Sequence, residues 1–223
     1  MNFKDTDYRE FLLSIKAPFV FFPSIENDKP ATGRKVYLRH DIDMRIDRAV
    51  FMARLEAEMG IRSTYFVLDT APYFGVDIQK EITEIQSYGH EIGWHNDAAQ
   101  AWYLTGRFKP IREFIETPLK KLRDYGAKVR GTAGHFVAHE NELIFHNYNI
   151  WKLKFNFQSV IPIEQFDLSE FGLEYETYFI KNNIYFCDSG NEWNHNPVST
   201  VQDFNSKDNR VMQLLIHPQW WSE

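Results

Sequence analysis

The sequence has only one cysteine, no basic stripe and no long apolar run, and each shortage excludes a class of protein. Cys187 alone forms neither an intramolecular disulfide nor a cysteine-built metal site. No stretch approaches the roughly 18 apolar residues of a membrane span, and no apolar segment with a basic flank marks an export signal. Lys and Arg number 25 against 31 Asp and Glu, a formal net charge of −6, which disfavours a nucleic-acid partner. We therefore expect a cytoplasmic protein.

The composition points to one folded domain. The 223 residues are 43% apolar and 25% charged, which is ordinary for a globular protein. Aromatic residues reach 16%, which indicates a core or a cleft rich in rings. No linker divides the chain, so we expect a single domain over residues 1–223. The sequence leaves the oligomeric state open, and an oligomer is compatible with it.

The apolar pattern alternates between strand and helix periods. A lead-in over residues 1–34 holds a short helix at 7–16 and a loop. The first three strands are then predicted at 35–43, 63–69 and 90–95. A fourth begins at 128 and ends near Arg130, and two later strands are predicted at 183–188 and 210–217. Helices at 48–59, 78–88 and 109–125 separate the first four strands, and a glycine follows each helix. This alternation predicts parallel βα units in a barrel or an open sheet.

Histidine, aspartate and arginine residues gather where the predicted strands end. In chain order they are Arg39, His40, Asp41, Asp43, His95, Asp97, Arg130, His135, Asp188 and His217. The strand beginnings carry Lys35, Ser63 and few other polar residues. Because reacting groups in parallel α/β folds lie at the carboxyl ends of the strands, this asymmetry predicts a functional site at that edge.

The segment RHDID places two carboxylates on one face of a strand. Side chains alternate along a strand, so Arg39, Asp41 and Asp43 share one face and His40 and Ile42 the other. Two carboxylates so close together repel each other unless a cation lies between them or one is protonated. A divalent metal bound by one, with the other acting as a base, resolves the repulsion. The alternative is a surface turn in which both are solvated.

Two histidines at strand ends are candidates for chemistry. The imidazole of His95 is a ligand type that zinc and other transition metals accept, although a single histidine is often only hydrogen-bonded in the core. His217 follows an apolar strand and precedes Pro218. Its unperturbed pKa near neutrality suits a general acid, and a buried, hydrogen-bonded histidine is the alternative.

Four further residues have a functional and a structural interpretation. Arg130 either holds a carboxylate by a bidentate bond or forms a structural ion pair. Asp188 is either a catalytic carboxylate or the first residue of an Asx turn. Trp193 and Trp220 either stack on sugar rings of a substrate or belong to the core.

In order and spacing, these segments resemble the polysaccharide deacetylase-like family with NodB homology, carbohydrate esterase family 4. LRHDID (38–43) stands where the family has a TFDDG-type motif, and GHEIGWH (89–95) resembles its GHEIGNH run. VRG (129–131), FCDSGNEW (186–193) and LLIHP (214–218) resemble its three later motifs. The RHDID form is most similar to a divergent branch linked to surface-polysaccharide biosynthesis.

The resemblance implies a single-domain α/β fold, a deformed (β/α) barrel of about seven parallel strands over residues 35–218. It also implies one divalent metal, usually zinc, and hydrolysis of the N-acyl group of an amino sugar or its nucleotide-linked precursor by metal-activated water. By position, Asp41 would be the base, Asp43 and His95 metal ligands, Arg130 the group that orients the base, and His217 the acid.

The sequence departs from the family at the second metal histidine, which follows the first by four residues. That position is Ala99 here. One carboxylate and one imidazole are too few ligands for a catalytic zinc site. His135, a few residues beyond the fourth strand, is the first candidate for the third ligand, and Asp97 is the second.

Three functions remain open at this stage. The first is a metal-dependent C–N hydrolase, a deacetylase of amino sugars, which the presence of Asp41, Asp43 and His217 favours. The second is a catalytically inactive barrel that binds carbohydrate or joins a complex, which Ala99 favours. The third is a metal-dependent hydrolase of another small amide. An open, aromatic cleft would favour the first over the third, and a small closed cavity the reverse.

Overall fold

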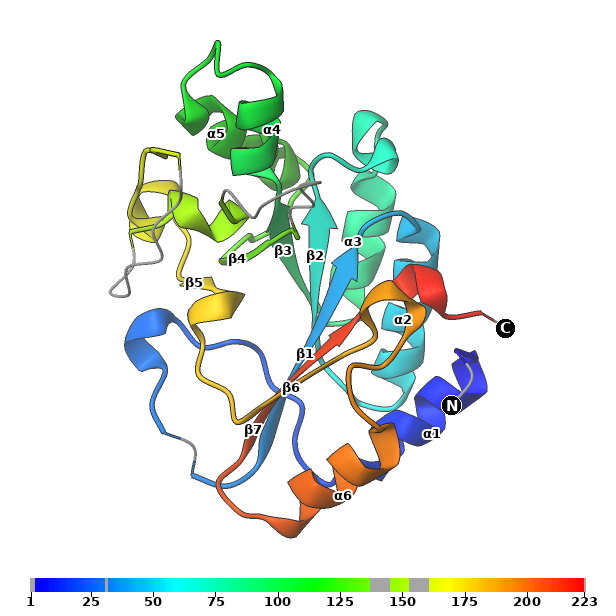
Figure 1. Ribbon diagram of the computed structural model, residues 1–223. Coiled ribbons are helices and arrows are strands. Elements are labelled where there is room, and N and C mark those ends of the chain that lie inside the picture. The colour runs from blue at the N-terminus through cyan, green and yellow to red at the C-terminus, as the bar shows by residue number, and fades with distance from the viewer. Residues whose placement is uncertain (1–2, 31, 137–144, 153–160, 223) are drawn as a thin grey trace.

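A sheet of seven parallel strands forms the centre of the protein, in the order β5-β4-β3-β2-β1-β7-β6 (Figure 1). This computed structural model describes residues 3–30, 32–136, 145–152 and 161–222. The strands are β1 Lys35–Ile42, β2 Thr64–Leu68, β3 Glu91–Asn96, β4 Gly131–Gly134, β5 Tyr175–Glu176, β6 Ile184–Cys187 and β7 Val211–Ile216. The sheet curls and stays open between its edge strands β5 and β6, which confirms the expected deformed (β/α) barrel.

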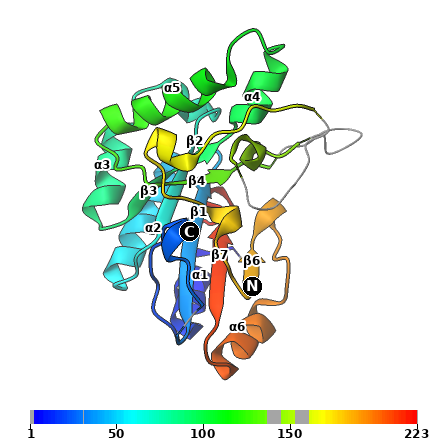
Figure 2. The ribbon, with the colours of Figure 1, turned by 90° about the vertical axis from the view of Figure 1, so that its left-hand side faces the viewer.

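The described residues also form six α-helices, which pack around the strands. They are α1 Asp5–Ser14, α2 Ile46–Glu58, α3 Gln79–Ser87, α4 Ala98–Leu104, α5 Ile111–Asp124 and α6 Pro197–Ser206. Figure 2 shows α2 and α3 along one side of the strands, with β6 on the other side. The glycines predicted to end three of the helices, Gly60, Gly89 and Gly126, all have positive φ angles, as that role requires. No helix within the described ranges is long and apolar enough to cross a membrane.

Strand β1 is buried on both faces, and its side chains alternate as the sequence predicts. Val36 and Leu38 pack in the core between the sheet and α1. Tyr37 points the opposite way, into a small core inside the barrel. Arg39 and Asp41 continue that inward face toward the carboxyl end of the strand, where both line a cavity. Burial on both faces is typical of parallel strands covered on each side.

The core inside the barrel closes its amino-terminal end. Phe22, from the lead-in loop, stacks on Tyr37 and Tyr175, with ring centroids 4.9 and 5.2 Å apart. The ring of Tyr175 also explains Gly131 on the neighbouring strand. A Cβ atom at Gly131 would lie 1.9 Å from that ring, so a glycine is required there. The packed rings form a floor beneath the carboxyl ends of the strands.

A buried charged network lies behind β1. Glu56 of α2 is fully buried, and its carboxylate lies 2.7 Å from Nε2 of His40 and accepts a 2.6 Å hydrogen bond from the Ser63 hydroxyl. The hydroxyl of Tyr8 also donates to it. Burial acts to raise the pKa of Glu56, but the facing His40, together with His90 and the hydrogen bond from Ser63, outweighs it and lowers that pKa to about 2. The histidine of RHDID therefore ties α2 to the sheet and faces away from the cavity.

Candidate functional site

A cavity of about 930 Å³ opens at the carboxyl ends of the strands, the edge where the sequence predicts a functional site. Its titratable lining residues include Arg39, Asp41, Asp43, His95, His135, Glu176 and His217. Its rings include Phe136, His146, Tyr148, Tyr178 and Tyr185. The volume is in the upper part of the range for small-molecule sites. Polar side chains that are far apart in the sequence therefore line one cavity.

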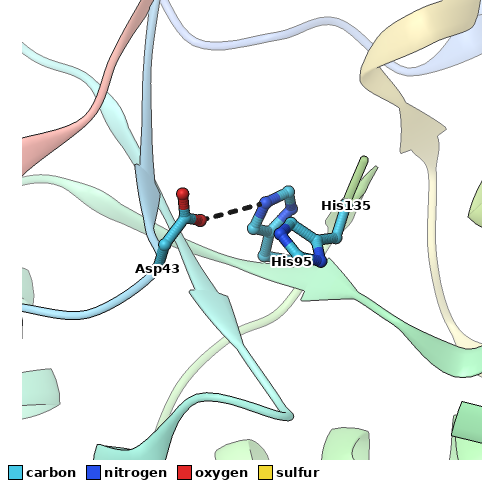
Figure 3. Close-up of side chains that lie close together, drawn as sticks. All are labelled: Asp43, His95 and His135. Carbon is cyan, nitrogen blue, oxygen red and sulfur yellow. Dashed lines mark ion pairs between the residues drawn. The ribbon is translucent and has the colours of Figure 1, made fainter. Parts of the chain in front are cut away.

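Asp43, His95 and His135 come together in this cavity (Figure 3). Each offers one ligand atom, and the three atoms lie within 4.8 Å of one another. Nε2 of His95 is 3.5 Å from Oδ1 of Asp43. The three residues follow or end three different strands, β1, β3 and β4. The described residues thus contain a candidate His/Asp metal site, and His135 is the imidazole that Ala99 does not supply.

Both histidines are oriented by a hydrogen bond at Nδ1. In His95 this nitrogen donates to the carbonyl oxygen of Ala133 at 2.8 Å, which leaves Nε2 with its lone pair toward Asp43. In His135 it faces Oδ1 of Asp97 at 3.4 Å. Such partners fix the tautomer of metal-binding histidines. Asp97, the second candidate for the third ligand, therefore lies behind His135 and orients it.

The donor atoms of the trio suit a divalent transition metal. Two imidazoles and one carboxylate are the protein ligands of many catalytic zinc sites, and the same set also binds iron(II). Oδ1 of Asp43 is buried and has no hydrogen-bond partner among the described residues. Burial acts to raise the pKa of Asp43, but the facing imidazoles of His95 and His217 together outweigh it and lower that pKa, so the group is an anion near neutral pH. A cation would satisfy this oxygen.

Asp41 is held by Arg39. The guanidinium donates from Nε and Nη2 to the two carboxylate oxygens, each at 2.7 Å, and from Nη1 to the hydroxyl of Thr177 at 2.8 Å. Burial acts to raise the pKa of Asp41, but the charge and hydrogen bonds of Arg39, together with the nearby imidazoles of His95 and His217, outweigh it and hold that pKa well below its usual range. Oδ2 of Asp41 also lies 3.3 Å from Nε2 of His95. An ionised carboxylate thus lies beside the trio.

His217 is held by Asp188 on another side of the cavity. Nδ1 of His217 lies 2.7 Å from Oδ1 of the fully buried Asp188, which also accepts from the backbone N–H of His217 and from Nε1 of Trp221. Burial acts to lower the pKa of His217, but the hydrogen bond and charge of Asp188, together with the charges of Asp41 and Asp43, outweigh it and raise that pKa. Nε2 of His217 is 3.8 Å from Asp43. A histidine biased toward its protonated form therefore faces the trio.

Glu176 is a cavity residue that the sequence reasoning missed. Its buried carboxylate accepts from the backbone N–H of Gly134 at 3.1 Å and of Tyr178 at 3.4 Å. Burial raises the pKa of Glu176 to about 7. The available signal was one acidic residue within the aromatic run YETYF, which is unusual for a solvated side chain. Its strand, β5, is only two residues long and has no periodicity to reveal it.

The structure corrects the assignment of Arg130. That residue precedes β4 instead of ending it, so it lies at the opposite end of the barrel from the cavity. Its guanidinium forms ion pairs with Glu91 and Glu174 at 3.0 and 2.7 Å. The prediction that Arg130 contacts Asp41 is wrong, and Arg39 makes that contact. The structural ion pair was the correct alternative.

The two tryptophans proposed to bind substrate pack elsewhere. Trp193 stacks on Phe186, with ring centroids 4.5 Å apart, and lies beside Phe11 of α1. Trp220 packs against the same core cluster. Neither side chain lines the cavity. The prediction that these tryptophans line the substrate site is wrong, because both rings pack against the core cluster instead.

Comparison with known proteins adds little to this geometry. No protein-family model matches the sequence, and no curated protein matches it. Among solved structures, the chain is similar to a family 4 carbohydrate esterase from Bacillus anthracis, with 13% identity and a TM-score of 0.40. The match covers 96% of this chain and 79% of that one. Functional conclusions therefore rest on the residues of the cavity.

Proposed function

We propose that the protein is a metal-dependent C–N hydrolase that removes an N-acyl group from an amino sugar. One observation carries the proposal. A carboxylate and two imidazoles converge within 4.8 Å in a cavity that also holds an ionised aspartate and a histidine biased toward protonation. A metal site with a general base and a general acid beside it is one set of groups that can hydrolyse an amide with water.

Asp43, His95 and His135 would hold the divalent metal, with zinc the first candidate. When bound, such a metal polarises a carbonyl oxygen and lowers the pKa of water. Two observations support His135 as a ligand: its approach to His95, with ring centroids 5.0 Å apart, and the hydrogen bond to Asp97 that orients it. Ala99 favoured an inactive barrel because it leaves the metal without a second imidazole. With His135 as that imidazole, Ala99 no longer argues against catalysis.

Asp41 and His217 would move the protons. Hydrolysis adds hydroxide to the acyl carbon, breaks the C–N bond and puts a proton on the leaving nitrogen. Asp41, ionised beside Arg39, would accept the proton of the attacking water. His217, protonated through its contact with Asp188, would donate a proton to the amine. Arg39 and Asp188 act as positioning residues, because each fixes the orientation and charge of its partner.

The size and lining of the cavity favour a sugar over a small cyclic amide. A volume of about 930 Å³ holds more than one sugar ring, and aromatic side chains line part of the wall. A site for a small amide would be closed and smaller. An open, aromatic cleft is the feature that separates these two hydrolase hypotheses.

Metal content and acyl release test the proposal together. The protein is purified without chelators or a histidine tag and loaded with zinc or cobalt, and acetate release from N-acetylglucosamine oligosaccharides is measured. We expect about one metal per chain and hydrolysis of the amide, with both lost in His95→Ala and His135→Ala. The exposed His195 provides the matched control, His195→Ala, which should keep both. A folded protein that takes up no metal would overturn the proposal.

A further inference from the structure

One buried asparagine holds both the backbone of His135 and the carboxylate that faces its ring. Asn147 begins the short helix η3 (Asn147–Ile150) and is fully buried. Its side-chain nitrogen donates to the carbonyl oxygen of His135 at 3.0 Å and to Oδ1 of Asp97 at 2.8 Å. An amide nitrogen carries two hydrogens, so each acceptor takes one. Both donor positions of Asn147 are therefore used on His135 and its partner.

The other end of this amide is anchored on α4. Oδ1 of Asn147 accepts from the backbone N–H of Gln100 at 3.0 Å. Because that N–H can only donate, it identifies this end of the amide as the oxygen and leaves the nitrogen toward His135. The bond also satisfies one of the free N–H groups in the first turn of α4. Asn147 thus connects the helix that follows β3 with the residue that follows β4.

The ring of His135 is oriented mainly through its backbone and through Asp97. The backbone N–H of His135 donates to the carbonyl oxygen of Asn96 at 2.9 Å, and its carbonyl accepts from Asn147. The contact between the ring and Asp97 is 3.4 Å, which is too long for a strong hydrogen bond. The direction of the ring therefore depends on where the backbone of His135 lies relative to that carboxylate, and Asn147 bonds to both.

Asp97 has other donors that fix its position. Its Oδ2 accepts from the hydroxyl of Thr70 at 2.8 Å and from the side-chain nitrogen of Gln100 at 3.3 Å. These bonds do not involve Asn147. Removing the amide of Asn147 would therefore leave Asp97 held by one oxygen, while the carbonyl of His135 would lose its partner. The effect of such a change should fall on His135.

We propose that Asn147 is a positioning residue for metal binding, which places His135 as the third ligand beside Asp43 and His95. With His135 misplaced, the site keeps one carboxylate and one imidazole, too few ligands for a catalytic zinc. Loss of a residue that orients a metal ligand typically weakens metal binding about 10- to 100-fold. The inference rests on the proposed function, because the metal is part of that proposal.

Zinc titrations of the metal-free protein against a competing chromophoric chelator test this role without hydrolysis. We expect Asn147→Ala to bind zinc about 10- to 100-fold more weakly than the wild type. Asn147→Asp keeps the acceptor for Gln100 but has no N–H to donate, so it should bind zinc at least as weakly as Asn147→Ala does. The visible spectrum of bound cobalt(II) should change in both variants, since it reports the number and geometry of the ligands.

Asn205→Ala is the matched control. Asn205 also joins two segments through its amide, which accepts from the backbone N–H of Lys16 and donates to the carbonyl oxygen of Ser14, each at 2.9 Å. These contacts connect α6 with the end of α1 and do not involve the trio. The control should lower the stability of the fold and leave the zinc affinity and the cobalt spectrum unchanged.

Two results would overturn Asn147 as a positioning residue. One is a folded Asn147→Ala or Asn147→Asp protein that binds zinc as tightly as the wild type does. The other is an equal loss of zinc affinity in Asn205→Ala, which would mean that the affinity follows overall stability. A wild-type protein that binds no zinc would overturn this role and the hydrolase proposal together. Zinc binding that depends on Asn147 without release of acetate would refute the hydrolase alone.

Discussion

Arg39 and Asp41, two positions apart on strand β1, form a bidentate ion pair with two hydrogen bonds of 2.7 Å. Both side chains are buried, so the pair is shielded from the screening that weakens surface ion pairs. The guanidinium of Arg39 keeps the carboxylate of Asp41, which faces His95, in its ionised form. The ion pair also engages the guanidinium of Arg39, which is the one Lys or Arg among the described residues that line the cavity.

Replacing Arg39 should shift the acidic limb of the pH profile of kcat/KM. In Arg39→Gln, burial acts on Asp41 without the opposing guanidinium charge, so the pKa of Asp41 rises. We expect the acidic limb of kcat/KM for amide hydrolysis to move up by about one pH unit or more. Arg39→Lys keeps the charge and should restore part of the shift. Arg45→Gln, which removes an exposed arginine, is the control, and an acidic limb that stays in place in Arg39→Gln would exclude Asp41 as its source.

Replacing Asp188 should affect the basic limb instead. Asp188→Asn keeps an acceptor for Nδ1 of His217 but removes the charge that raises the pKa of His217. His217 then loses its proton at lower pH, so the basic limb moves down and kcat falls about 100-fold. The pH profile of kcat measures both effects. Asp208→Asn, at an exposed position, should leave the profile unchanged, and so would Asp188→Asn if His217 were only structural.

The buried Glu56 should stabilise the fold far more than its neighbour on the same helix. Glu56→Ala leaves His40 and Ser63 without their buried acceptor, and we expect a loss of about 3–5 kcal/mol in unfolding free energy at pH 7. Because the pKa of Glu56 is lowered, its contribution is present above the ordinary value of 4.5 and is lost as the pH falls toward about 2. Urea denaturation at several pH values measures this.

Glu58→Ala is the matched control for Glu56→Ala. The side chain of Glu58 is 54% exposed and lies 3.9 Å from Arg9 in a surface ion pair. Such pairs contribute little to stability, so the control should unfold nearly like the wild type. Equal losses in the two variants would mean that the network around Glu56 does not stabilise the fold.

Glu176 should have the opposite pH dependence. Burial raises the pKa of Glu176 to about 7, so the folded metal-free protein loses stability as the pH rises from 4.5 to about 7. Glu176→Gln cannot ionise, so its unfolding free energy should fall less over that range, by up to about 3 kcal/mol. Denaturation of both proteins across the range measures the difference. Glu174→Gln, at an exposed position two residues earlier, should follow the wild type, and parallel curves for Glu176→Gln would refute the raised pKa.

The sequence by itself determined the parallel α/β architecture and the edge that carries the site. Apolar runs of strand length alternate with amphipathic stretches that end at Gly60, Gly89 and Gly126, and local patterns of this kind need no tertiary information. Strand periodicity also placed Arg39 and Asp41 on one face. The patterns were too short to reveal α4, which has seven residues, and β5, which has two.

Only the tertiary structure decided which polar residues meet. His135 joins Asp43 and His95 because β1 and β3 flank β2 and β4 follows β3, an order that sets distances across the sheet and leaves no mark on local sequence. Arg130 does not reach the cavity because β4 begins at Gly131, the next residue. Its side chain is therefore at the opposite end of the barrel. Trp193 packs against the core because Phe11 of α1 lies beside its ring. Side-chain chemistry can be read from a chain, but the partners of each side chain depend on register and strand order.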